Sequence, residues 1–104
     1  MIRHIVLMKW RPDADPAAVA EFAENCNRLP EKIPGVRRYQ TGADIASCQS
    51  TKLRDNFDFG VVADFDDYVA FENYLTHEVH RTFVQQHVRP ILEDRAAMQM
   101  QIDG

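Results

Sequence analysis

The segment Ile2-Arg3-His4-Ile5-Val6-Leu7-Met8-Lys9-Trp10 has the alternating pattern of a β-strand. One face of this strand carries Ile2, His4, Val6, Met8 and Trp10. The other face carries Ile5 and Leu7. A strand with apolar residues on both faces is expected in a sheet that is covered on both sides.

The remaining elements follow outward from this strand. Asp15 and Pro16 predict a helix start, because an N-cap acceptor precedes a proline at the first helical position. The helix carries one apolar stripe and should end between residues 30 and 35; the stripe consists of Val19, Phe22, Ala23, Cys26 and Leu29. Further strands are predicted over 36–41, 57–65 and 95–102. The polar segment 42–56 is expected to be a flexible loop and a candidate lid.

Two more helices are predicted between the third and fourth strands. Asp66 or Asp67 caps the first, whose apolar side consists of Tyr68, Phe71, Tyr74 and Leu75. The second starts near Glu78 and turns inward Val79, His80, Phe83, Val84, His87, Val88 and Ile91. The order β-α-β-β-α-α-β predicts an α+β fold of the ferredoxin-like, split βαβ type, with a four-stranded antiparallel sheet and helices on one face.

The sheet face opposite the helices carries Ile5, Leu7 and Val62, which should not remain in contact with water. Pairing two sheets about a twofold axis would cover them, with an interface of roughly 1,600 Å². We therefore predict a homodimer through the sheet face. The length of 104 residues predicts a single domain over 1–104.

Composition argues against several classes of function. The net charge is −4 and the basic residues are scattered, so no cationic face for nucleic acid is expected. The longest apolar run is far short of the ~20 residues of a membrane helix, and no signal-peptide pattern opens the chain. Cys26 and Cys48 do not have the spacing of a metal site. A cytoplasmic protein is the expectation.

The motif Tyr74-Leu75-Thr76-His77-Glu78-Val79-His80-Arg81-Thr82-Phe83 carries the candidate chemistry. Histidine titrates near neutrality, so a histidine beside a tyrosine in an apolar cavity can transfer protons. His80 is the candidate general base, and Tyr74 would hydrogen-bond a developing enolate. The alternative for His80 is a core histidine that is satisfied by a backbone carbonyl.

For the other polar residues, the structural interpretation is favoured over the functional one. His4 points into the apolar layer as either a structural or a cavity histidine, His77 should cap or flank a helix end, and His87 is expected in the core or at its rim. Buried Cys26 should behave as a small hydrophobe rather than a nucleophile. The spacing of His77 and His80 does not match a zinc motif, so neither a metal held by side chains nor another cofactor is expected. A Mg²⁺ held by backbone carbonyls at residues 33–36 would leave no side-chain signature and stays open. The side chains expected to line a ligand cavity are His4, Val6, Met8, Phe22, Cys26, Phe59, Val61 and Phe83.

Four segments resemble one known family, the stress-responsive α/β-barrel domain, also called the dimeric A/B barrel. They are the opening strand 1–10, the helix exit Leu29-Pro30-Glu31-Lys32-Ile33-Pro34-Gly35-Val36, the strand 57–65 and the junction 74–84. The resemblance spans essentially the whole chain and implies a ferredoxin-like protomer that forms a dimeric α/β barrel.

The resemblance also bears on function. The plant polyketide cyclase branch of this family is similar, and it uses a tyrosine and a histidine for cofactor-free aldol cyclisation. Those roles would fall on Tyr74 and His80, with His4 in the same cavity. The chain departs from that branch at Phe59, where the branch has a histidine, at Cys26, where it has a tyrosine, and at Glu78, where it has a proline.

The leading hypothesis is a cofactor-free homodimer that binds a small apolar carbonyl compound and catalyses its cyclisation or isomerisation. The alternative is a non-catalytic, stress-associated binding or structural dimer whose cavity is filled by side chains. The volume of the cavity distinguishes the two.

Overall fold

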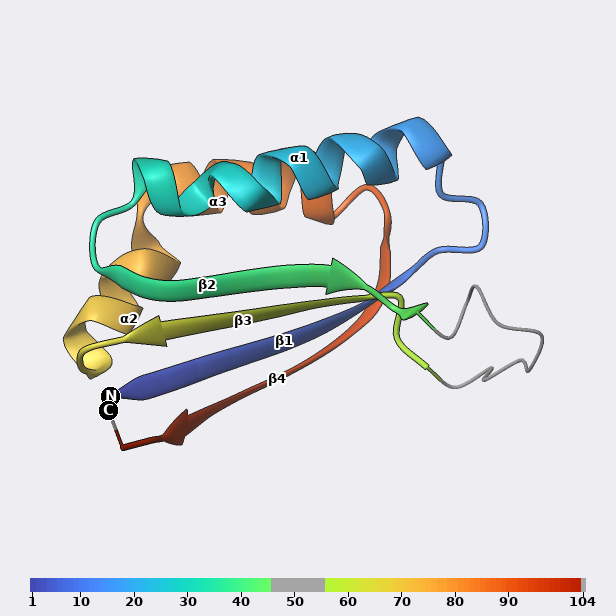
Figure 1. Ribbon diagram of the computed structural model, residues 1–104. Coiled ribbons are helices and arrows are strands. Elements are labelled where there is room, and N and C mark those ends of the chain that lie inside the picture. Colours follow the sequence, from blue (N-terminus) through green and yellow to red (C-terminus); the bar gives the residue numbers. More distant parts are fainter. Residues whose placement is uncertain (46–55, 104) are drawn as a thin grey trace.

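The computed structural model describes residues 1–45 and 56–103. Figure 1 shows a sheet with helices on one side. The elements, in chain order, are β1 (Ile2–Trp10), α1 (Pro16–Lys32), β2 (Val36–Ala43), β3 (Phe59–Phe65), α2 (Tyr68–Thr76), α3 (Glu78–Phe83), the π-helical turn η2 (Val84–Val88) and β4 (Leu92–Gln101).

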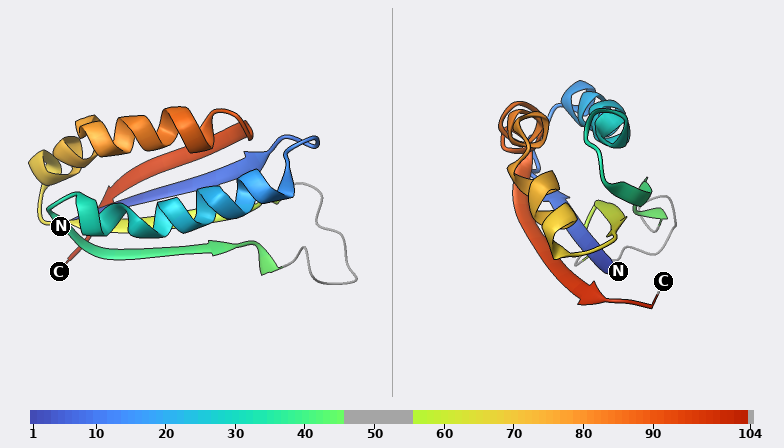
Figure 2. Two further views of the ribbon diagram at one scale, coloured as in Figure 1. Left: turned by 90° about the horizontal axis from the view of Figure 1, so that it is seen from above. Right: turned by 90° about the vertical axis from the view of Figure 1, so that its left-hand side faces the viewer.

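The four strands form one antiparallel sheet in the order β2-β3-β1-β4. Figure 2 shows α1 and α3 side by side over the same face of the curved sheet. This topology is that of the ferredoxin-like fold, so the predicted fold class is confirmed. β1 lies between β3 and β4, so both of its backbone edges are hydrogen-bonded to neighbouring strands.

Strand boundaries differ from the prediction at three places. β2 continues through Gly42 and Ala43, β3 starts at Phe59, and β4 starts at Leu92. The early start of β4 follows from its pairing with Trp10 across a register shift at Lys9 and Trp10. The predicted lid over 42–56 falls mainly on residues 46–55, which lie outside the described part of the chain.

Helix α1 starts as predicted and ends at Lys32, within the predicted range of residues 30 to 35. The Asp15 carboxylate accepts a hydrogen bond from the Ala17 amide at 3.0 Å, and Pro16 follows the cap. The helix then passes through Pro30 to Lys32. Proline lacks the N–H that would bond to the carbonyl four residues earlier, which is that of Cys26. The Tyr39 hydroxyl donates to this carbonyl at 2.9 Å, so the orphaned acceptor is satisfied from β2.

The second helical region is capped twice. The Asp67 carboxylate accepts from the Ala70 amide at 2.9 Å at the start of α2. His77 ends α2 and starts α3, where its Nδ1 accepts from the Val79 amide at 3.1 Å, as the predicted capping role requires. Tyr68 was expected on the apolar side but is 59% exposed. It is the first residue of α2, and its ring makes an edge-to-face contact with Phe71 at 5.8 Å between centroids.

After α3 the backbone widens into η2, where the Arg89 amide bonds to the Val84 carbonyl five residues earlier. A π-turn rotates the residues after it relative to an α-helix. His87 therefore does not share the inward position of His80. It contacts Phe83 and lies in an outer groove between α1 and α3.

The core contains two aromatic clusters at opposite ends of β1. Near Trp10, the rings of Trp10 and Phe22 lie 4.9 Å apart, and those of Phe22 and Phe59 lie 5.0 Å apart. Near His4, the rings of Phe65 and Phe71 lie 5.6 Å apart. Among the described residues, no helix is long and apolar enough to cross a membrane.

Candidate functional site

A cavity of about 370 Å³ lies between the sheet and the helical layer, between the two aromatic clusters. Its walls come from β1, α1, β2, β3, the two helices after β3, η2 and the start of β4. Most of the lining is apolar. The polar or ionisable side chains in the lining are His4, Cys26, Tyr39, Tyr74, His80, Arg89 and Arg95.

Six of the eight side chains expected around the ligand line this cavity: His4, Val6, Met8, Cys26, Val61 and Phe83. Phe22 and Phe59 do not. They pack against each other and against Trp10 in the neighbouring aromatic cluster. Both residues face inward, as expected, but they lie nearer the Trp10 end of the core than the cavity does. Phe22 is one helical turn before the lining residue Cys26, and Phe59 is two residues before the lining residue Val61.

The two candidate catalytic residues, Tyr74 and His80, both line the cavity, and their rings are in tilted contact at 4.5 Å between centroids, with 54° between the ring planes. α2 presents Tyr74 from its last turns, and α3 presents His80 from its first, because His77 breaks the helix between them. The junction therefore brings together two side chains that one continuous helix would space differently.

The environment of His80 fixes its protonation. Burial lowers the pKa of its imidazole, a hydrogen bond to the Leu75 backbone opposes this effect, and the charge of Arg95 adds to it. The backbone carbonyl can only accept, so the ring nitrogen that faces it carries the proton. The second nitrogen of the neutral ring is an acceptor. The backbone bond expected for a structural histidine is thus present, and the ring still borders the cavity.

Tyr74 remains a hydrogen-bond donor. Burial raises the pKa of its phenol far above the neutral range, and the neighbouring Cys26 adds to the shift. The side chain is 3% exposed and also contacts Phe65 at 5.2 Å between ring centroids. A phenol that stays protonated can donate to an oxygen that gains negative charge.

His4 is held by a side chain of the neighbouring strand β4 on the same face of the sheet. Its Nδ1 lies 2.6 Å from the Gln99 amide oxygen, which is directly across from it on β4. Because that oxygen only accepts, Nδ1 carries the proton in this arrangement. Burial lowers the pKa of this imidazole as well. Its ring lies edge-on to Tyr74 at 6.3 Å between centroids.

Tyr39 is a cavity residue that the sequence interpretation missed. Its hydroxyl donates to the Cys26 carbonyl at 2.9 Å, lies 3.2 Å from the Cys26 thiol, and interacts with the Tyr74 hydroxyl. Burial raises its pKa above the accessible range. Residues 36–41 are of mixed polarity, so their sequence did not indicate which side chains face inward. In the structure Tyr39 lies on the inner face, like its strand partner Ala63.

Cys26 is unsuited to nucleophilic attack. Burial raises the pKa of its thiol to about 11, although the Tyr39 hydroxyl acts in the opposite direction. The thiolate fraction at neutral pH is therefore very small.

Arg89 and Arg95 were also missed. Both are exposed residues that line the cavity where η2 leads into β4, so this is the side that faces solvent. The charge of Arg95 lowers the pKa of both His4 and His80. The sequence signal was weak, because Arg89 and Arg95 belong to no motif. The apolar lining residues that the sequence did not assign to the cavity are Leu29, Leu75, Val84, Val88 and Leu92, although the first four were expected to face inward.

Within residues 1–45 and 56–103, no three His, Cys, Asp or Glu side chains are grouped so as to hold a metal ion.

Comparison with known proteins identifies the family. Residues 2–102 match the model of the Stress responsive A/B Barrel Domain family, called Dabb. A dimeric ferredoxin-like protein of unknown function from Thermobifida fusca YX is 35% identical; the match covers 97% of this chain and 90% of that chain, with a TM-score of 0.81. None of the curated proteins compared matches the chain.

Two further structures share the fold at lower identity. A Dabb family protein from Mesorhizobium loti is 21% identical, with 99% and 97% of the two chains covered and a TM-score of 0.79. The hydroxynitrile lyase from Passiflora edulis is 17% identical, with 98% and 93% covered and a TM-score of 0.83. The chain belongs to the stress-responsive A/B barrel domain family.

Proposed function

We propose that this member of the stress-responsive A/B barrel domain family binds a small, largely apolar carbonyl compound in its cavity and catalyses proton transfer next to the carbonyl. The observation that carries the proposal is the ring contact between Tyr74 and His80, at 4.5 Å between centroids, in the lining of a cavity of about 370 Å³. The volume lies in the range of small-molecule sites.

The reaction follows from the protonation states. His80 presents an unprotonated ring nitrogen and removes a proton from the carbon next to the carbonyl. The electron pair of the broken C–H bond moves into the enolate, whose oxygen accepts a hydrogen bond from the Tyr74 hydroxyl. When a C=C bond is conjugated with the enolate, the imidazolium returns the proton to the far carbon of that dienolate and the double bond shifts, which is an isomerisation. Alternatively, the enolate carbon attacks a second carbonyl of the same molecule and that oxygen takes the proton, which is an aldol cyclisation.

The magnitude of each contribution supports this division of roles. A positioned general base contributes roughly 10²–10⁴-fold in rate. An oxyanion donor contributes about 10²–10³-fold. The pKa of Cys26, at about 11, favours proton transfer over covalent catalysis by its thiol. No step in this scheme draws on a cofactor.

The competing proposal is a non-catalytic binding or structural protein. It is favoured by the hydrogen bond that ties His80 to the Leu75 backbone, which a purely structural histidine would also make. The open cavity argues against a structural role alone, because side chains do not fill it.

Exchange of carbon-bound protons tests catalysis without knowledge of the natural substrate. Octan-2-one is dissolved in D₂O with the protein, and NMR measures the loss of protons next to the carbonyl. We expect the protein to accelerate exchange, and His80→Ala to reduce the acceleration by about 10²-fold or more.

His87→Ala is the matched control, because His87 lies on the same helical segment but outside the cavity. It should retain the activity of the unmodified protein. If His80→Ala exchanges protons as fast as His87→Ala, His80 is not the base. Absence of any acceleration, together with binding of the ketone, would favour the non-catalytic proposal.

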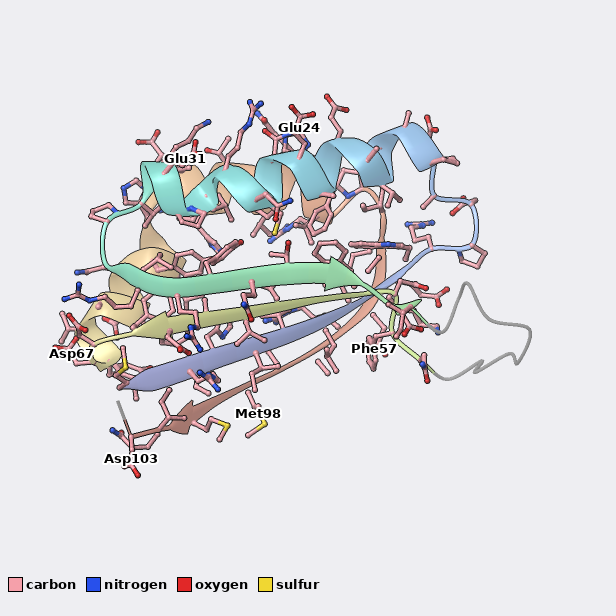
Figure 3. The ribbon with its side chains drawn as sticks, viewed as in Figure 1. Glu24, Glu31, Phe57, Asp67, Met98 and Asp103 are labelled. Carbon is pink, nitrogen blue, oxygen red and sulfur yellow. The ribbon has the colours of Figure 1, made fainter. Side chains whose placement is uncertain are left out.

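We also propose that the protein is a homodimer through the outer sheet face. The solved relative from Thermobifida fusca is described as dimeric. Strand register brings together an apolar stripe on this face, which consists of Ile5, Leu7, Val62, Ala96, Met98 and Met100. Figure 3 shows Met98 extending from β4 away from the helices. Met98 is 53% exposed and Leu7 40% exposed, which is unusual for a sheet face left in water.

A cytoplasmic location is part of the same proposal. The free, buried thiol of Cys26 suits a reducing compartment.

A further inference from the structure

Two arginines, Arg89 and Arg95, line the cavity on its solvent-facing side, and nothing in the proposed proton transfer uses them. Arg89 follows η2, and Arg95 lies on β4 opposite Met8. Both side chains line the cavity together with apolar neighbours such as Val84, Val88 and Leu92. The cavity therefore has an apolar interior and, at its solvent-facing side, a cationic rim that consists of Arg89 and Arg95.

These charges lack a carboxylate partner in the described part of the chain. No Asp or Glu lines the cavity, and neither arginine takes part in an ion pair there. The nearest carboxylate along the chain, that of Asp94, accepts a hydrogen bond from the Arg95 backbone amide. In the strand register Asp94 lies across from Lys9, on the other face of the sheet.

The charge of Arg95 also acts on groups inside the cavity. The charge of Arg95 lowers the pKa of both His4 and His80, the two imidazoles whose rings contact Tyr74. The whole protein carries a net charge of −4, so overall attraction does not bring anions to this rim. Any preference for an anion must come from the local pair of arginines.

We infer that the ligand is an apolar carboxylic acid whose carboxylate is held by Arg89 and Arg95 while its apolar body fills the cavity. A guanidinium binds a carboxylate through two parallel hydrogen bonds, which gives orientation as well as affinity. This inference rests on the proposed function and narrows it. The substrate class becomes an oxo acid, with its carboxylate at the rim and its reacting carbonyl beside Tyr74.

Two probes of equal size test the inference by isothermal titration calorimetry. Octanoate carries the charge, and octanamide has the same shape without it. We expect octanoate to bind at least about tenfold more tightly, because hydrogen bonds to a charged group contribute more than neutral ones. The double variant Arg89→Gln/Arg95→Gln should lose this preference and keep its affinity for octanamide.

Arg81→Gln is the matched control, because Arg81 is an exposed arginine of α3 that does not line the cavity. It should keep the preference for octanoate. Equal binding of the two probes by the unmodified protein would overturn the carboxylate inference and leave the cavity as a site for neutral compounds. Binding of neither probe would overturn the inference and the proposed function together. A preference that persists in the double variant would also overturn the inference.

Discussion

At the scale of single residues, hydrogen bonds to fixed acceptors set the state of each imidazole. The Leu75 backbone holds His80, and Gln99 holds His4 at 2.6 Å. Burial lowers the pKa of both rings, so both are neutral at neutral pH and each keeps one acceptor nitrogen. The motif containing Tyr74 and His80 could be found in the sequence. Gln99 could not, because its role depends on the register between β1 and β4.

The lowered pKa values predict how stability depends on pH. An unfolded histidine has a pKa of about 6.5, whereas the folded pKa of His4 and His80 lies below its ordinary value. Between these values the unfolded chain binds more protons than the folded one, so the free energy of unfolding falls as pH falls through about 6.5. Asp64 and Asp66 have lowered pKa values and lose their contributions only at more acidic pH, below about 4.

Urea denaturation at a series of pH values between about 7.5 and 5 measures this dependence. The charged and titratable groups acting on His80 are His4, Arg95 and His77. We expect His80→Gln to flatten the dependence and His87→Gln, outside the cavity, to preserve it. An equally steep loss of stability in His80→Gln would show that His80 is not the group responsible.

At the scale of elements, the sequence predicted helix starts better than strand boundaries. Caps at Asp15, Asp67 and His77 are local side-chain bonds and were identifiable from spacing. The continuation of α1 through Pro30 was not, because it depends on Tyr39 from β2. The π-turn η2, which turns His87 away from the cavity, likewise has no local sequence signature. Phe22 and Phe59 were assigned the correct face but the wrong end of the core, since periodicity specifies a face and not a position along it.

The bond between Tyr39 and the end of α1 can be measured by a double-mutant cycle. Tyr39→Phe removes the donor to the buried Cys26 carbonyl and should lower the free energy of unfolding by about 1–3 kcal/mol. Pro30→Ala restores a backbone N–H that can take over this acceptor. In the Pro30→Ala background, the cost of Tyr39→Phe should therefore shrink by about 1 kcal/mol in urea denaturation. Identical costs in both backgrounds would mean that Pro30 and Tyr39 do not share the Cys26 carbonyl.

At the scale of the whole molecule, the ferredoxin-like arrangement gives the two sheet faces different tasks. The inner face, with α1 and α3, encloses the cavity, and the outer face carries the apolar stripe. Both tasks were foreseeable, because alternation along β1 separates His4, Val6 and Met8 from Ile5 and Leu7. The arginines at the rim were not, since they come together only where η2 meets β4.

The proposed dimer is tested by introducing a charged side chain into the apolar stripe of the outer sheet face. Met98→Glu would bury a carboxylate without a partner in the interface, so we expect multi-angle light scattering to give the mass of a monomer. Val69→Glu is the control, because Val69 is 67% exposed on α2, on the helical side of the sheet. It should leave the dimer intact. A dimer in the Met98→Glu protein, or a monomer without any substitution, would refute the outer face as the interface.

The central claim is that the Tyr74 phenol and the His80 imidazole act on one bound molecule. The most direct measurement is the rate of proton exchange of octan-2-one in His80→Ala, Tyr74→Phe and the double variant. Groups that act as a unit are strongly non-additive, so the double variant should be about as slow as the slower single variant. Losses that multiply in the double variant would mean that the two rings act independently, and would contradict the account.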